Sequence, residues 1–378
     1  MLYLQGMKLK QLPAHQKKIL FAFLIIILAM VVYSSLISQS NDKSVASKSG
    51  LKESLEINYD YKHAKIRLPY NLLFGELSYS EWLRKEKANL LSVLKIPTKI
   101  LPKPKWHKTN NFKKDDIEIS TYMLKYPKGI ISDHGFFLAR PTLKKIKGLV
   151  VAIHGHEEPY RGNLPEKMLD DNHWSTHFID SGYIVLIPSH VFYESIKQLV
   201  NNQAHHYVWT RFISDSLEIA VKELNKFIPV YAAGVSSGCT TAMLLAIIEE
   251  RIKAFSGGGC TAPLSFLRQF YRIPNHPNQW DLPEFEDELP VLALGAHKHF
   301  QFQIGEKDIL FPDGEEWITS SGETITQRDI LVSELAGIFL ASKEIFRKAS
   351  LGGQIVLTRH QFGHTLDPQK SIEFFKGK

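Results

Sequence analysis

The sequence predicts an α/β domain in which a mostly parallel, eight-stranded sheet carries helices on both faces. Two observations predict it. Eight segments of strand length recur between residues 117 and 360, and most are continuous apolar runs, as expected for strands that are buried on both faces. Segments with helical spacing of apolar residues separate several of these strands, and alternation of strand and helix favours a parallel sheet.

The predicted elements can be placed in chain order. A helix that Ser80 could cap comes first, and the first two strands form a hairpin. Later helices are expected near 212–227 and 237–250, and another begins near Asp367. The stretch 87–114 contains lysines and prolines but no acidic residue, which predicts a solvated connector or, alternatively, a contact with an anionic membrane surface. The predicted strands are 117–126, 136–140, 148–155, 182–189, 229–234, 252–258, 299–305 and 354–360.

The N-terminal region is predicted to lie outside this domain. Residues 19–37 are almost wholly apolar and uncharged, and about 20 such residues span a bilayer. The lysines of residues 1–18 predict a cytoplasmic tail, a single transmembrane anchor and a domain on the non-cytoplasmic side. The alternative is a cleaved signal peptide and a secreted protein. Residues 38–75 are expected to form a linker, and 76–378 the folded domain.

The composition excludes some functions. The net charge is +7, but four of these charges lie in residues 1–18, which hold no acidic residue. No nucleic-acid-binding motif is present, so a nucleic-acid partner is not expected. The two cysteines, Cys239 and Cys260, are too few for a disulfide scaffold and lack the spacing of a metal site. They are either bridged in an exported domain or buried as small apolar side chains.

The stretch "YAAGVSSGCTTAMLLA" (231–246) carries the main functional signal. It places Gly234, Ser236 and Gly238 in a G-x-S-x-G pattern between a buried strand and a helix. A turn this sharp brings backbone so close to both glycine positions that a Cβ would clash, and it presents the serine hydroxyl at the sheet edge. Ser237 does not fit the pattern, because Val235 and Cys239 stand at its flanks. Ser236 is therefore the predicted nucleophile.

A serine nucleophile needs a base and an acid that orients the base, in the chain order serine, acid, histidine. Asp308 follows the strand 299–305 and is the predicted acid, with Glu306 as its rival. His364 follows Gly363 in the loop before the last helix and is the predicted base, whereas His360 lies nearer the strand and is expected to be structural.

The developing oxyanion needs hydrogen-bond donors, and the backbone N–H groups of His156 and Ser237 are the predicted pair. His154, His156, Glu157 and Glu158 could also suggest a metal site. Their spacing lacks the H-E-x-x-H helix pattern, and a proline follows directly, so neither a metal nor another cofactor is expected.

Taken together, "GLVVAIHGHEE", "GVSSG", "ERIKAFSGG", "IGEKDILFP" and "FGH" resemble the α/β-hydrolases, specifically the branch of dienelactone hydrolases and acetyl xylan esterases. The resemblance covers roughly residues 76–378 and implies an α/β-hydrolase fold with Ser236, Asp308 and His364 as the triad. Two stretches depart from the family pattern. They are the residues after "HG" at 154–155 and the insert at 313–328, and both bear on specificity.

The expected function is hydrolysis of a carboxylic ester, on a small molecule, glycan or lipid, through an acyl-enzyme. The aromatic-rich segment near 261–290 is expected to form a cap or lid over the site. Two alternatives stay open. One is peptide or amide hydrolysis by the same residues, and the other is an inactive membrane-tethered binding protein.

Overall fold

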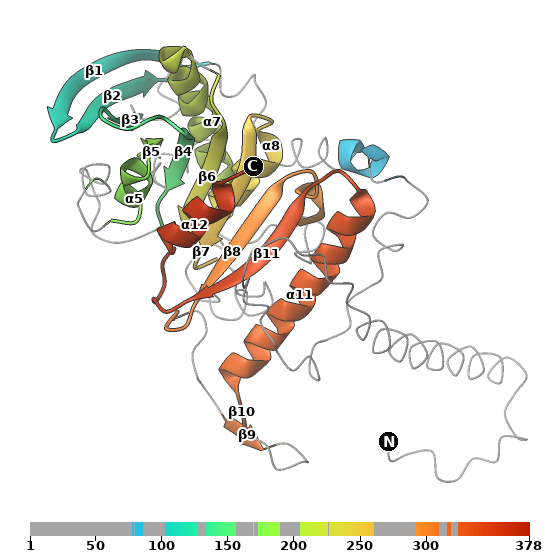
Figure 1. Ribbon diagram of the computed structural model, residues 1–378. Coiled ribbons are helices and arrows are strands. Elements are labelled where there is room, and N and C mark those ends of the chain that lie inside the picture. The colour runs from blue at the N-terminus through green and yellow to red at the C-terminus, as the bar shows by residue number, and fades with distance from the viewer. Residues whose placement is uncertain are drawn as a thin grey trace, which may run out of the picture. The chain divides into compact units, whose positions relative to one another are not determined.

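The central sheet of the computed structural model contains nine strands among the described residues, in the order β1-β2-β3-β5-β4-β6-β7-β8-β11 (Figure 1). Strands β1, β2, β3 and β5 pair antiparallel, and the pairs from β5 to β11 are parallel. The strands of this sheet are β1 (Lys105–Lys114), β2 (Ile117–Lys125), β3 (His134–Pro141), β4 (Gly148–Ile153), β5 (Tyr183–Pro188), β6 (Val230–Val235), β7 (Ile252–Gly258), β8 (His299–Gly305) and β11 (Gln354–His360).

The structure describes a large part of the compact unit Leu55–Lys378. The predicted membrane anchor at 19–37, the linker, His156 and the predicted cap near 261–290 lie outside the described residues. No helix in the described part is both long and apolar enough to cross a membrane. The described residues are 78, 80–85, 103–127, 134–155, 169, 173–189, 205–225, 227–260, 292–309, 316–318 and 324–378.

All eight predicted strands are present, as β2 to β8 and β11, and β1 is an additional edge strand. The prediction of a connector at 87–114 was therefore wrong for Lys105–Lys114. Every residue of β1 is exposed, so this strand shows no alternation of buried apolar and exposed polar positions that could reveal it. Its lysines suit an edge strand, because charge at an unpaired edge discourages pairing with other chains.

Helices cover both faces of the sheet, as predicted, because alternate residues of a strand point to opposite faces. In β4, Leu149 and Val151 belong to one buried cluster, which α7, α8 and α11 cover. Val150 and Ala152 belong to the second cluster, which α5 and α12 cover. The helices are α5 (Thr176–Asp180), α7 (His205–Leu224), α8 (Ser237–Ile248), α11 (Gln327–Ala349) and α12 (Pro368–Phe375).

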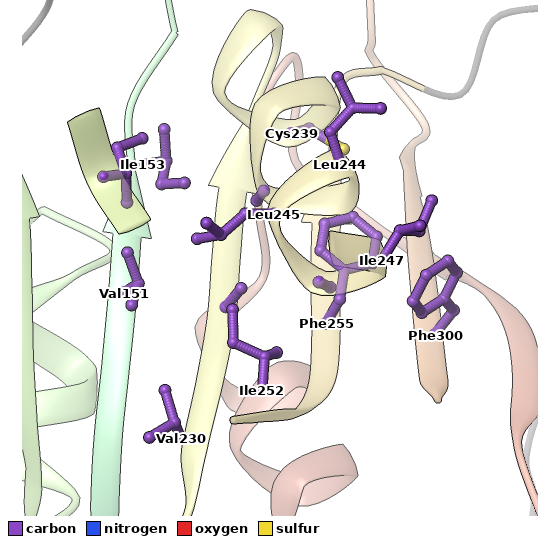
Figure 2. Packing of buried hydrophobic residues seen from close by; sticks show 14 of the residues in the cluster. Val151, Ile153, Val230, Cys239, Leu244, Leu245, Ile247, Ile252, Phe255 and Phe300 are labelled. Atoms are coloured by element: carbon purple, nitrogen blue, oxygen red, sulfur yellow. The ribbon is translucent and has the colours of Figure 1, made fainter. Parts of the chain in front are cut away.

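The central helix α8 is held by apolar contacts. Figure 2 shows Leu244, Leu245 and Ile247 packed among side chains of the strands beneath, including Phe255 and Phe300. All five side chains are at most 1% exposed. Burial of one such side chain stabilises the fold by about 1.5–3 kcal/mol, so these contacts anchor α8 firmly on the sheet.

Two local features were not predicted from the sequence. The first helix is capped by Ser78 rather than Ser80: the Glu81 N–H donates to Ser78 Oγ at 3.3 Å, and the Ser78 N–H donates to Glu81 Oε2 at 3.0 Å. The insert at 313–328 contains a short hairpin of β9 (Glu316–Ile318) and β10 (Thr324–Thr326). The hairpin leads into α11, where Thr326 and Asp329 form a capping box.

Candidate active site

Ser236 occupies the corner between β6 and α8. Its backbone has φ 55° and ψ −127°, a conformation that costs an ordinary residue on the order of 1–3 kcal/mol. The Ser236 N–H donates to the carbonyl of Gly258 at 2.9 Å, which ties the corner to the end of the neighbouring strand β7. The side chain is half-buried. This is the strained strand–turn–helix geometry that the G-x-S-x-G pattern predicted.

The two glycines of the pattern are required by backbone contacts. A Cβ on Gly234 would lie 2.3 Å from the Gly238 oxygen. A Cβ on Gly238 would lie 2.2 Å from the His154 oxygen and 2.3 Å from that of Ile153. Backbone atoms cannot swing aside as a flexible side chain can, so any larger residue at either position would displace the corner that holds Ser236.

Ser237 is the first residue of α8, and its side chain is completely buried. Its Oγ has no hydrogen-bond partner among the residues that the structure describes. The first N–H groups of a helix lack partners within the helix and carry partial positive charge, so the backbone of Ser237 is suited to stabilise an anion. The other predicted donor, His156, lies outside the described residues.

Asp308 and His364 are brought together by a hydrogen bond. His364 Nδ1 lies 2.8 Å from Asp308 Oδ1, and the side chain of Asp308 is completely buried while that of His364 is 23% exposed. A carboxylate accepts from Nδ1–H, which leaves Nε2 as the nitrogen that can accept a proton. The pair thus has the arrangement of a base and its orienting acid.

Glu306 and His360, the alternatives to Asp308 and His364, have different surroundings. Glu306 is exposed, and its N–H donates to the carbonyl of His360 at 2.8 Å. His360 is buried beside that turn, where its Nδ1 accepts from the Phe362 N–H at 3.3 Å. Burial lowers the pKa of His360, against the opposing charge of Asp367. These contacts tie His360 to its own loop.

Ser236 and His364 approach consecutive glycines at the end of β7. Ser236 bonds Gly258, and the ring of His364 packs on the next residue: a Cβ on Gly259 would lie 2.8 Å from His364 Cε1. Gly259 has φ +68°, a conformation that favours glycine. Sequence reasoning did not single out these two glycines, although "SGGGC" directly after a strand is a local signal of close backbone packing.

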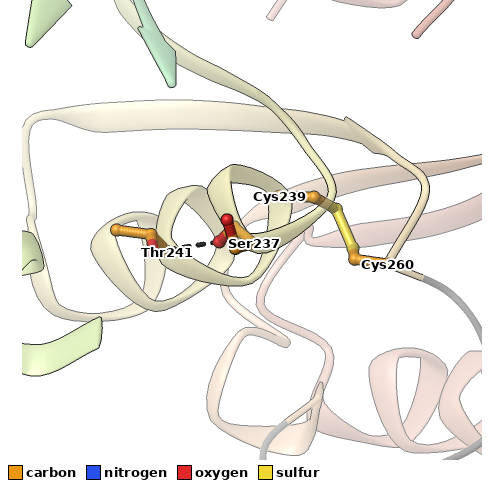
Figure 3. Close-up of a disulfide and its surroundings, with 4 residues drawn as sticks. All are labelled: Ser237, Cys239, Thr241 and Cys260. Carbon is orange, nitrogen blue, oxygen red and sulfur yellow. Dashed lines mark hydrogen bonds between the residues drawn. A yellow bond between two sulfur atoms is a disulfide. The ribbon is translucent and has the colours of Figure 1, made fainter. Parts of the chain in front are cut away.

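A disulfide joins Cys239 to Cys260, with Cα atoms 5.7 Å apart (Figure 3). Cys239 lies in the first turn of α8, three residues after Ser236, and Cys260 follows Gly259 directly. The bridge therefore connects the serine corner to the segment against which His364 packs. This settles the question of pairing that the sequence left open.

The turn that holds Asp308 also contacts the insert, because Arg328 of α11 donates to the carbonyl of Glu306, two residues before Asp308.

The metal alternative gains no support from the described residues, among which no three histidine, cysteine, aspartate or glutamate side chains form a metal-binding group. His154 of that set is buried, and its Nδ1 lies 2.9 Å from the Gly155 oxygen, whereas 156–158 fall outside the described part.

Comparison with known proteins gives matches to solved structures only. No protein-family model matches the sequence, and no curated protein matches it. A glucuronoyl esterase from Solibacter usitatus superposes with a TM-score of 0.57 at 12% identity, covering 83% of this chain and 97% of the other. A glucuronoyl esterase of family CE15 from Teredinibacter turnerae T7901 gives 0.55 at 14% identity, covering 90% and 97%.

A crystal structure of a putative acetyl xylan esterase from Bacteroides fragilis NCTC 9343 gives a TM-score of 0.50 at 13% identity, covering 85% of each chain. These proteins are α/β-hydrolases. At identities this low the likeness concerns the fold alone. The chain has an α/β-hydrolase fold.

Proposed function

We propose that the chain is a serine hydrolase that cleaves carboxylic esters, with Ser236 as nucleophile, His364 as base and Asp308 as the acid that orients it. The observation that carries the proposal is that the N–H of the strained Ser236 bonds Gly258, while the ring of His364, whose Nδ1 is held by a fully buried carboxylate, packs on the next residue, Gly259. A serine at its ordinary pKa is a weak nucleophile, and this arrangement supplies the base that it needs.

In the proposed reaction each of these groups has the role that its chemistry allows. His364 Nε2 takes the proton of Ser236 as Oγ attacks the acyl carbonyl, and Asp308 stabilises the imidazolium that forms. The backbone N–H groups of Ser237 and His156 bind the oxyanion. The protonated His364 then donates to the departing alcohol, and a water molecule hydrolyses the acyl-enzyme in the same manner.

The substrate class is also a proposal. The solved structures that superpose on this chain are named as glucuronoyl esterases and a putative acetyl xylan esterase, so a carbohydrate ester is the natural first substrate class to test. Matched ester and amide substrates of the same acyl group would separate ester hydrolysis from amide hydrolysis.

The decisive experiment compares the wild type with Ser236→Ala. The wild type should react with a fluorophosphonate probe and hydrolyse short p-nitrophenyl esters. Ser236→Ala should lose the labelling and at least about 10³-fold in kcat. Ser350→Ala is a matched control, since Ser350 also has a positive φ, 53°, but caps the exposed end of α11. A wild type that neither reacts with the probe nor cleaves esters would refute the proposal.

We further propose that residues 19–37 anchor the chain and place the domain on the non-cytoplasmic side of a membrane. The uncharged apolar run and the lysines before it support this orientation. The Cys239–Cys260 bridge fits an oxidising compartment. Protease treatment of sealed membrane vesicles tests the proposal: digestion of the domain from the cytoplasmic side, or release of the chain by alkaline carbonate, would contradict it.

A further inference from the structure

A polar cluster lies buried between the sheet and α12, where apolar side chains are the usual occupants. Its members are at most 4% exposed. Ser256 Oγ lies 2.8 Å from Ser371 Oγ and donates to Gln301 Oε1 at 2.8 Å, which links β7, β8 and α12. Gln303 Nε2 lies 2.9 Å from Ser371 Oγ and 3.1 Å from Ser256 Oγ. The four polar members are Ser256, Gln301, Gln303 and Ser371.

Gln303 also makes two hydrogen bonds to the backbone of Asp367, the last residue of the segment 361–367 that carries His364, here called the histidine loop. The Asp367 N–H donates to Gln303 Oε1 at 2.7 Å, and Gln303 Nε2 donates to the Asp367 carbonyl at 3.2 Å. Asp367 in turn caps α12, because its side chain accepts from the N–H groups of Gln369 and Lys370. Gln303 therefore fixes the point where the loop enters α12, three residues after His364.

The same residue stands on the strand that leads to the acid. Gln303 lies in β8, which ends at Gly305, and Asp308 lies in the turn that follows directly, so the strand that bonds the loop also leads into the turn that holds the carboxylate. An apolar side chain at 303 would leave the part-buried N–H of Asp367 without this partner, whereas the Asp367 carbonyl would still accept from the Ser371 N–H and Oγ. A donor that loses its partner in this way costs about 1–3 kcal/mol, so the loop would shift to satisfy the Asp367 N–H elsewhere.

We propose that Gln303 is a positioning residue that sets where His364 stands relative to Asp308 and Ser236. The inference rests on the proposed function and deepens it. Reaction rates depend on the placement of the base to within a fraction of an ångström, and a displacement of about 1 Å can cost about 10²-fold in rate. Gln303 acts through backbone and has no role in binding the ester, so its loss lowers kcat and leaves KM nearly unchanged.

Gln301 provides a matched control. It lies on the same strand and the same face, it is 4% exposed, and its Oε1 accepts from Ser256 Oγ and Gln303 Nε2. None of its hydrogen bonds among the described residues reaches the histidine loop. Gln301→Leu therefore removes a buried amide from the same cluster while leaving both bonds between Gln303 and Asp367 in place.

The test compares Gln303→Leu, Gln301→Leu and Gln303→Glu on p-nitrophenyl acetate. Gln303→Leu should lose about 10²-fold in kcat with KM within about threefold, and Gln301→Leu should stay within about fivefold in both. Gln303→Glu keeps an oxygen that accepts from the Asp367 N–H, so it should recover part of the rate. This variant carries the comparison if Gln303→Leu does not fold.

Hydrogen exchange supplies a readout that does not depend on activity. Amides of the segment 361–367 should exchange faster in Gln303→Leu than in the wild type and in Gln301→Leu. Equal exchange in all three proteins, or equal losses of kcat in the two leucine variants, would overturn the inference while the proposed function stands. A wild type without esterase activity and without probe labelling would instead overturn the proposed function, and the inference with it.

Discussion

Opening the Cys239–Cys260 bridge should lower the free energy of unfolding by about 3 kcal/mol. The two cysteines are 21 positions apart in the sequence, and the bridge restricts the unfolded chain by closing a loop of that size. The chain-entropy relation gives on the order of 3 kcal/mol at 25 °C for such a loop. Reduction leaves both side chains in place, and Cys239 is completely buried in the main core, so the packing of the folded state is nearly the same before and after.

Urea unfolding followed by fluorescence, with and without a phosphine reductant, measures this difference. The m-value should also rise on reduction, because the unfolded chain without the cross-link exposes more surface. The double variant Cys239→Ala/Cys260→Ala is the control, and the reductant should leave its stability unchanged. Ester hydrolysis measured in parallel should weaken on reduction, since the bridge ends beside Gly259, on which His364 packs.

Two results would refute this reasoning. A loss of less than about 1 kcal/mol on reduction would show that the loop entropy is not the main contribution of the bridge. A similar loss in the double alanine variant would show that the reductant acts elsewhere in the molecule, because that variant has no bridge to open.

Two further predictions follow from the packing. Gly238→Ala places a Cβ 2.2 Å from the His154 oxygen, so the serine corner must move, and ester hydrolysis should fall by about 10²-fold or more. In the control Gly352→Ala, the new Cβ meets nothing within 4 Å; its φ of +75° should cost some stability, but the rate should stay normal. Burial lowers the pKa of His299 and His360, so the unfolded state binds more protons below about pH 6.5 and the free energy of unfolding should fall as the pH drops through that value. Urea unfolding at several pH values should show a shallower fall in the double variant His299→Gln/His360→Gln, and an unchanged slope would contradict this account.

The strands of the sheet could be predicted from the sequence where their burial requires a pattern of apolar residues. Strands such as Gly148–Ile153 are buried on both faces and appear as continuous apolar runs. The strand Lys105–Lys114 is exposed throughout and has no such pattern. The helix Gln327–Ala349 was also not predicted, although its buried positions keep helical spacing, as in Val332, Leu335, Ile338 and Phe339.

The features of the candidate site likewise fall into two groups: those that a local sequence pattern predicts and those that depend on residues far apart in the sequence. The need for glycine on each side of Ser236 is a local steric requirement, so five adjacent residues were sufficient to predict the corner. The Cys239–Cys260 bridge and the hydrogen bonds between Gln303 and Asp367 could not be predicted from a local pattern. They depend on the register of strands far apart in the sequence, and a single sequence carries no local sign of that register.

The run Gly257–Gly259 shows why the end of β7 must be free of side chains. A Cβ on Gly257 would lie 2.3 Å from Cys239 Sγ, one on Gly258 would lie 2.2 Å from the Thr365 oxygen, and one on Gly259 would meet the ring of His364. Each glycine thus makes room for a different neighbour: the bridge, the histidine loop and the histidine itself. Because the Ser236 N–H bonds the carbonyl in the middle of the same run, these three backbone positions set the distance between the serine corner and the histidine loop. Strand β7 bears none of the proposed triad residues, yet its last residues contact both the serine corner and the loop that carries His364.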